Sequence, residues 1–363
     1  MTAKLNYTRE EIFAEYQFAS HVKIGDYLFH GGLDAEGNYL SPRSLHRIPA
    51  IKAWTQRLKD AGHTTTVFTA DDLPMTFFPN TEQSKLLLHH GCKDAMARTL
   101  TMVGTIEGYG NAGIALFPQE DLQKYFVEDI EGTCLAHLQY LLPAHGHDEA
   151  FSDYKGYKES GHEEMWWVIR DVCLDYPEIT DDMFEDLPIP PPPGYQGRAK
   201  AAPDALNIAE AIPLAMTPGV PPVLEFMVTG LTSLLAIEFA AASTFKWAKE
   251  VLGDPECSSD PEFAVKWVNA ISADETIHVT SLQCALSELS TLTILGTEGQ
   301  HIPGKPVLEA AVKRTIASQQ GDRFDRVLAH RMKYIKRELD ARPDGEKILA
   351  EFAELGPVPE FVA

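Results

Sequence analysis

The sequence predicts a mainly helical fold, and three observations support this. From residue 81 onward, apolar side chains recur at helical spacing over long segments, whereas residues 1–80 read as a mixture of short helices and strands. Two of the helical segments carry the spacing Glu-x-x-His, and a proline-rich stretch without periodic pattern, residues 177–221, separates them. We therefore expect a small mixed α/β region, a helical bundle over residues 81–296 and a helical extension over residues 297–363.

Composition narrows the class of protein. The chain has 363 residues, of which 44% are hydrophobic and 23% charged, as in a soluble globular protein. The formal net charge of −22 argues against a nucleic-acid partner, since phosphate binding needs a basic surface. The N-terminal residues do not resemble a signal peptide, so we expect a cytoplasmic protein. Five cysteines without a Cys-x-x-Cys pair favour neither a disulfide framework nor a zinc ribbon.

The first half of the bundle is expected to hold three helices, over residues 81–116, 119–142 and 150–175. The second of these carries Glu131 among leucines at helical spacing, with Glu128 one turn earlier as the alternative. The third carries Glu159 and His162, which a helix places on one face. The break between the last two helices is short, so they should lie side by side and antiparallel.

The second half of the bundle begins after Pro222. Glu238 is the only charged residue between Phe226 and Phe245, in a run nearly long enough to span a membrane. A carboxylate in the middle of such a span is costly, so we expect no membrane span. Burial in a protein core is costly too, unless the carboxylate is paired or binds a metal. The next helix, residues 261–295, bears Glu275 and His278.

The chain therefore contains two repeats, each a helix with a glutamate, a turn, and a helix with Glu-x-x-His. Glu131 precedes Glu159 by 28 positions, and Glu238 precedes Glu275 by 37. Order and spacing resemble the ferritin-like di-iron carboxylate proteins, in which two helices give one Glu each and two others give Glu-x-x-His. The resemblance covers residues 119–295 and implies a ferritin-like four-helix bundle with a long crossover.

The resemblance also implies a site with two metal ions. The implied ligands are Glu131, Glu159, His162, Glu238, Glu275 and His278. Glu159 and Glu275 would bridge the two ions, and each histidine would complete the shell of one. Oxygen ligands with imidazole suit two Fe ions, with Mn or a mixed Fe/Mn pair as alternatives.

Three neighbouring residues bear on this site. In ribonucleotide reductase small subunits and bacterial multicomponent monooxygenases, which belong to this superfamily, an Asp directly before the second motif accepts a hydrogen bond from a ligand histidine, and Asp274 matches it. Lys158 stands at the matching position of the first motif, so the two halves differ. Glu163 follows His162 and shares the face of Glu159, which makes it a candidate proton relay; a solvent-facing Glu163 is the alternative.

The function that the resemblance implies is a non-haem di-iron oxidoreductase, an oxygenase or oxidase that uses O₂ on a small, apolar substrate. Two alternatives stay open: a ferroxidase or iron-handling protein, and a metal-free helical interaction protein. A homodimer also stays open. The basic segment over residues 323–337 is a solvated face, pairs with the acidic stretch over residues 171–186, or docks an acidic electron-donor protein.

Overall fold

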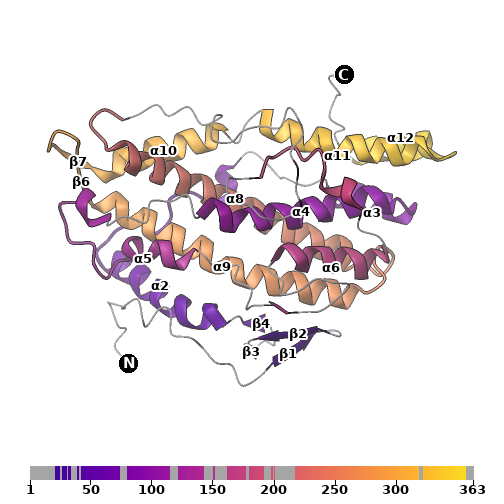
Figure 1. Ribbon diagram of the computed structural model, residues 1–363, viewed down its shortest axis with the longest axis horizontal. Helices are drawn as coiled ribbons and strands as arrows, with labels where there is room; N and C mark the ends of the chain where they lie inside the picture. The colour runs from indigo at the N-terminus through magenta and orange to yellow at the C-terminus, as the bar shows by residue number, and fades with distance from the viewer. Residues whose placement is uncertain are drawn as a thin grey trace.

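Helices make up most of the chain that the structure describes (Figure 1), so the prediction of a mainly α protein is confirmed. The computed structural model describes residues 21–24, 27–30, 32–33, 39–40, 42–73, 80–114, 122–142, 150–151, 162–176, 180–191, 198, 200, 217–318 and 322–356. Glu159 lies outside these residues, as does most of the predicted crossover.

Two long helices, α8 (Pro222–Leu252) and α9 (Pro261–Thr291), form a hairpin that runs through the molecule. Each has proline in its first turn, where the missing N–H has no helical partner to lose. The side chain of Asp260 caps α9 by accepting a hydrogen bond of 3.0 Å from the N–H of Phe263. Both helices were predicted from the sequence, and the structure confirms them to within a few residues at each end.

One end of this hairpin packs against α4 (Lys93–Ile114) and α6 (His162–Leu174). We call the shared apolar cluster the four-helix core, because all four helices contribute buried side chains to it. Large members include Leu100 on α4, Trp166 on α6, Phe245 on α8 and Trp267 on α9. The indole of Trp166 stacks on Phe245 with ring centroids 6.0 Å apart, so this tryptophan is a packing residue.

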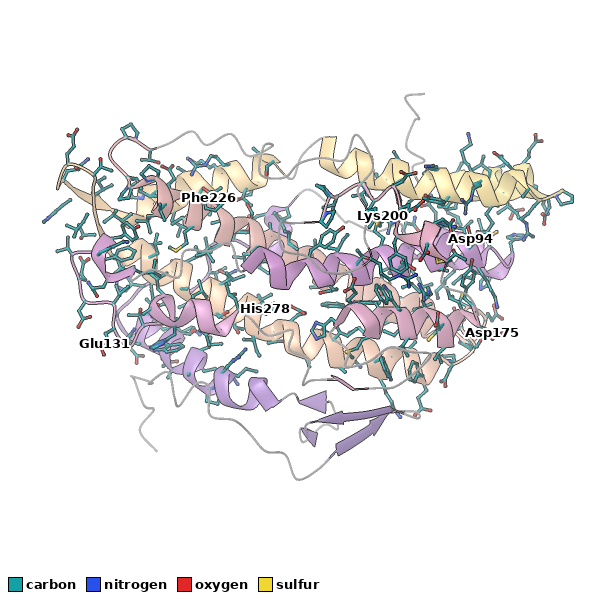
Figure 2. All side chains as sticks on the ribbon, viewed as in Figure 1. Asp94, Glu131, Asp175, Lys200, Phe226 and His278 are labelled. Atoms are coloured by element: carbon teal, nitrogen blue, oxygen red, sulfur yellow. The ribbon has the colours of Figure 1, made fainter. Side chains whose placement is uncertain are left out.

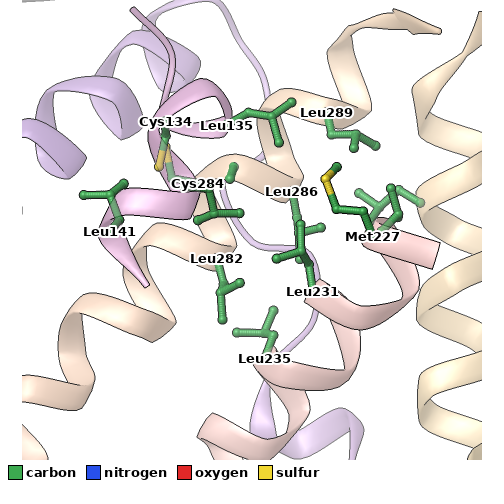
Figure 3. Close-up of a cluster of buried hydrophobic side chains, with 14 of the residues drawn as sticks. Cys134, Leu135, Leu141, Met227, Leu231, Leu235, Leu282, Cys284, Leu286 and Leu289 are labelled. Carbon is green, nitrogen blue, oxygen red and sulfur yellow. The ribbon is translucent and has the colours of Figure 1, made fainter. Parts of the chain in front are cut away.

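The other end of the hairpin packs into a second core with α2 (Pro42–Asp60), α5 (Cys134–Leu141) and α10 (Gly304–Ser318). Figure 3 shows leucines of α5, α8 and α9 meeting there, together with Met227 and the thiols of Cys134 and Cys284. The middle of the hairpin therefore lies between two apolar clusters. Packing in these clusters holds α8 and α9 in place at both ends of the hairpin.

Further helices and short sheets cover the bundle (Figure 1). The helices α3 (Thr81–His89), α11 (Asp322–Asp340) and α12 (Gly345–Leu355) lie with α10 along one side, where α11 contacts α4 and α12 contacts α3. Strands β1 (His21–Ile24), β2 (Tyr27–His30) and β5 (Ala150–Phe151) form an antiparallel sheet near α2, and β3 (Gly32–Leu33) pairs with β4 (Tyr39–Leu40). Strands β6 (Thr293–Leu295) and β7 (His301–Pro303) form a hairpin between α9 and α10.

The first half of the bundle differs from the prediction. The helix predicted over residues 81–116 is two helices, α3 and α4, because α3 ends in a Schellman turn at Gly91, which has φ +74°. The helix predicted over residues 119–142 is a short 3₁₀ turn (Leu122–Tyr125), a non-helical stretch and then α5. Thr133 caps α5, and Gly132 with φ +73° precedes it, so Glu128 and Glu131 lie before the helix. The helix that packs beside α6 is therefore α4, and not the helix predicted over residues 119–142.

The basic segment on α11 pairs with acidic groups, as one of the three sequence interpretations expected. Lys333 lies 3.4 Å from Asp186, and Arg337 lies 3.0 Å from Asp94 and 4.0 Å from Asp182. These ion pairs tie α11 to α4 and to the described part of the predicted crossover, which contains Asp182 and Asp186. Docking of an acidic electron-donor protein on this segment stays a prediction.

We expect His330 on α11 to make folding weaken in acid. Burial, with nearby cationic groups, lowers the pKa of this partly buried imidazole from 6.5 to about 4. The unfolded chain then binds the proton at a higher pH than the folded chain, so the stability from neutral His330 falls as the pH drops from 6.5 towards 4. The His330→Gln variant should lose less stability over this window, by up to about 3 kcal/mol. Urea denaturation between pH 4 and 8 measures this, with the exposed His63→Gln as control. Parallel curves for wild type and His330→Gln would contradict the prediction.

The helix α8 is long and apolar enough, by length and composition, to cross a membrane, and it alone meets that criterion in the part of the chain that the structure describes. Most of its apolar window is buried against α9, α10 and the four-helix core. Two buried carboxylates interrupt it, Glu225, which pairs with Arg314 at 3.2 Å, and Glu238. The apolar faces of α8 thus serve packing inside the protein.

Candidate metal centre

Three candidate ligands meet halfway along the α8–α9 hairpin, between the two cores. Glu275 and His278 are three residues apart on α9 and therefore share one face of it. Glu238 faces them from the middle of α8, because the two helices run antiparallel. The exposed fraction is 7% for Glu238, 4% for Glu275 and 1% for His278. The sequence predicted this group, and the structure brings it together.

The distances within this group are short. Nδ1 of His278 lies 3.0 Å from Oε1 of Glu238 and 2.7 Å from Oε2 of Glu275. Nδ1 of His162, a 2% exposed residue at the start of α6, lies 2.7 Å from the other oxygen of Glu275, Oε1. Glu275 therefore turns one oxygen to each histidine, which is the arrangement that a bridging carboxylate requires.

A further carboxylate, Glu107 on α4, completes a second group. One ligand atom each from Glu107, His162 and Glu275 lie within 4.8 Å of one another, and the same holds for Glu238, Glu275 and His278. The two groups share Glu275, and together they draw on α4, α6, α8 and α9. Glu107 is not among the ligands predicted from the sequence. The sequence does carry a signal for it, the same one that indicated Glu238, namely a single charged residue in an uncharged segment. Glu107 is the only charged residue between Thr99 and Ile114.

These distances suit metal ligands. Two ligand atoms about 2.1 Å from one metal and at right angles lie about 3.0 Å from each other. The separations of 2.7–3.0 Å between imidazole nitrogens and carboxylate oxygens match this value. Each of the two groups could therefore hold a metal ion.

The electrostatics of the site also favour cations. Burial and the neighbouring Glu275 raise the pKa of Glu107 to about 8 and that of Glu238 to about 7. Burial by itself would lower the pKa of His278, but Glu275 and Glu238 hold it well above its ordinary value. Carboxylates this close repel one another when ionised, and protons or metal ions relieve the repulsion. Metal binding would therefore release protons from the site.

Two glycines on α4 let α6 approach the site closely. A Cβ on Gly104 would lie 2.6 Å from the backbone oxygen of Glu163 and 2.9 Å from Cβ of Trp166. A Cβ on Gly108 would instead meet the side-chain carboxylate of Glu163, at 2.6 Å. Both contacts flank Glu107, so the helix separation that places Glu107 opposite His162 depends on these residues having no side chain.

We expect Gly104→Ala to harm the protein more than Gly108→Ala. At Gly104 the added methyl meets backbone and must push α6 away, at an expected cost of about 1–3 kcal/mol. At Gly108 the opposing group is the end of a flexible side chain, which can rotate away. Urea denaturation should show the larger loss for Gly104→Ala, and metal analysis should show reduced occupancy for that variant. Equal losses for the two variants would contradict the role of close backbone approach.

The structure does not bring every predicted ligand to this site. Glu131 is exposed in the turn before α5, and Figure 2 shows it at the edge of the molecule, away from His278. Its alternative, Glu128, is also exposed and accepts hydrogen bonds of 2.8 and 2.7 Å from the backbone and side chain of Thr293. The structure therefore does not bring Glu131 to this group, and Glu107 lies there instead. The sequence predicted one helix over residues 119–142, but α5 begins only at Cys134. Glu131 therefore lies in the turn before the helix and not on a bundle helix.

Other predicted residues have different outcomes. Glu159 lies outside the described residues, and of Asp274 the structure describes only the backbone, within α9. Glu163 is partly buried at the α4–α6 contact, so the solvent-facing alternative is not supported. Its carboxylate does not belong to either ligand group found among the described residues, and its role as a proton relay stays a prediction.

Comparison with known proteins adds no assignment, because no protein-family model, curated protein or solved structure matches this chain.

Proposed function

We propose that this protein is a dimetal oxidoreductase with a ferritin-like four-helix bundle, which activates O₂ to oxidise a small, apolar substrate. The observation that carries the proposal is the pair of ligand groups joined by Glu275. Five carboxylate and imidazole donors meet here and four of them are buried, although buried charge is costly unless it is paired or binds metal. Here the donors come from four separate helices and are enclosed between two apolar cores.

The order of the ligands along the chain supports the bundle type. With Glu107 in place of Glu131, the order is a glutamate on α4, His162 at the start of α6, a glutamate on α8 and Glu-x-x-His on α9. The pairs α4–α6 and α8–α9 pack as neighbours, and a long segment joins them. This is the pattern that ferritin-like dimetal proteins share. Glu159, one turn before His162, would be the second bridging carboxylate.

The donor set favours iron or manganese. Carboxylate and imidazole ligands suit Fe and Mn, and none of the donors among the described site residues is a thiol. When bound, two ferrous ions supply electrons for the reduction of O₂. The carboxylates and imidazoles of the two groups would hold the ions and neutralise their positive charge, and the surrounding cores would keep bulk water out. Glu163, next to His162, is the residue we expect to pass protons.

The proposal is tested with iron and oxygen. Anaerobic protein should bind up to two Fe²⁺ per chain, and admission of O₂ should consume oxygen and give an oxidised iron spectrum. With ascorbate as reductant, oxygen uptake should continue beyond one turnover at constant iron content. Uptake of many more than two iron ions per chain would favour iron storage instead. Protein that binds no Fe²⁺ or Mn²⁺ would leave a metal-free helical protein and overturn the proposal.

A further inference from the structure

A third group of side chains that could hold a metal ion lies away from the bundle centre, where α3 meets the turn between α8 and α9. His89 is the last residue of α3, and Asp254 and Cys257 stand in the turn. One ligand atom from each of the three lies within 4.8 Å of the others. The sequence pattern gave no hint of this group, because α3 and the turn are far apart along the chain.

The turn is fixed in shape before any ion binds. The backbone N–H groups of Cys257 and Ser258 both donate to the backbone oxygen of Asp254, at 3.0 Å each. The N–H of Glu256 donates to Oδ1 of Asp254 at 3.0 Å. Asp254 and Cys257 are therefore held on the same side of the turn, facing α3. A preformed pair of ligands lowers the ordering cost of binding an ion.

The donors differ in character and together favour zinc. An imidazole, a carboxylate and a thiolate are the three ligand types that Zn²⁺ uses in proteins. Glu256 offers a fourth donor, since its Oε2 lies 3.5 Å from Nε2 of His89. The side chain of His89 is 40% exposed, so an ion can enter from solvent and the ring is free to adjust. Cys257, by contrast, is 7% exposed, which shields a metal–sulfur bond from water.

The ammonium group of Lys85 competes with a metal ion for the carboxylate of Asp254. Its Nζ lies 2.8 Å from Oδ2 of Asp254, so this carboxylate is paired with an ammonium group when no metal is bound. The pair shows that the site attracts a cation and that α3 and the turn stay in contact. A divalent ion would compete with Lys85, whose long side chain is partly exposed and can turn to solvent.

We propose that His89, Asp254 and Cys257 form a zinc site that ties α3 to the turn between α8 and α9. Donor atoms about 2.0–2.3 Å from a tetrahedral zinc ion lie about 3.3–3.8 Å apart, so any pair of donors that is wider than this must close when the ion binds. Rotation of the exposed His89 ring supplies this movement. On binding, the thiol proton of Cys257 passes to solvent and the sulfur bonds to the metal. The site is independent of the dimetal centre and of the function proposed for it.

Cobalt(II) is the probe that tests this site in the full-length protein. A thiolate bound to Co²⁺ gives a charge-transfer band in the near ultraviolet, whereas the donor groups of the dimetal centre contain no sulfur. Wild-type protein should develop this band with one equivalent of Co²⁺ at the new site, and Zn²⁺ should remove it. Cys257→Ser should abolish the band, and Cys173→Ser, which alters another buried thiol near the same end of α9, should retain it.

Two further variants keep the test sharp if Cys257→Ser fails to fold. His89→Ala changes an exposed side chain and should weaken Co²⁺ binding by more than about tenfold, since even outer-shell partners of metal ligands carry that much affinity. Lys85→Gln removes the competing ammonium group and should tighten binding about fivefold. Absence of the band in wild type, its survival in Cys257→Ser, or unchanged affinity in His89→Ala would each overturn the proposal.

Discussion

Replacing Glu275 with alanine is expected to remove nearly all metal from the purified protein, the largest loss of any single substitution at the site. Glu275 is the residue that both ligand groups share, with one oxygen 2.7 Å from His162 and the other 2.7 Å from His278. If each group holds an ion, as we propose, the substitution takes one ligand from both ions at once. Inductively coupled plasma mass spectrometry on protein purified in parallel with wild type measures the change.

Two matched variants give this result its meaning. Glu107→Ala removes a ligand from one group only, so it should lose metal at that position and keep the ion held by Glu238 and His278. Glu131→Ala changes the exposed residue that the sequence alone suggested, and it should keep all the metal. Full metal content in Glu275→Ala would remove the dimetal interpretation. Metal loss in Glu131→Ala would restore Glu131 as a ligand.

The second half of the site could be predicted because the ends of its two helices are marked by residues typical of helix starts and stops. Proline and aspartate mark the start of α9, glycine and aspartate follow α8, and Glu238 stands alone in an apolar run. A charge that must be buried for the helix to pack has few roles other than pairing or ligation. The structure pairs Glu238 with His278, as that argument requires.

The first half could not be predicted in the same way, because local signals there point to the wrong segment. Residues 119–142 have leucines at helical spacing, but Gly132 adopts a positive φ and Thr133 starts a new helix after it. The carboxylate of Glu288 on α9 accepts the first two N–H groups of α5, at 3.2 and 2.9 Å. This tertiary contact fixes where α5 begins, and nothing in the local sequence reveals it. Periodicity alone therefore joined Glu131 to a helix that does not include it.

The helices that pack on the outside of the bundle show the same limit of prediction from local sequence. The pairing of basic α11 with acidic groups followed from net charge, and Lys333 with Asp186 bears it out. The zinc group, in contrast, depends on His89 meeting the α8–α9 turn, a contact between distant segments that charge and spacing do not encode. Local composition predicts which segments attract each other, and packing decides which side chains meet.

We expect Glu238→Leu to raise the thermal stability of the metal-free protein while lowering its metal content. Without metal, Glu238, Glu275 and Glu107 crowd one buried site, and burial with Glu275 raises the pKa of Glu238 to about 7. An apolar side chain of similar size removes one of the crowded buried carboxyl groups and with it the cost of ionising that group away from water. His278 keeps Glu275 at 2.7 Å as its partner, so the substitution leaves no charged group without a partner.

Glu238→Gln serves as the control, because it keeps a polar group that the site must still solvate, and its thermal stability should rise less. Thermal melts of chelator-treated proteins at pH 8, where Glu238 tends to ionise, should show the greatest gain for leucine, and the gain should shrink towards pH 6 as the wild-type carboxyl becomes neutral. A metal-free Glu238→Leu protein that melts well below wild type would mean that Glu238 is kept for folding and not for ligation.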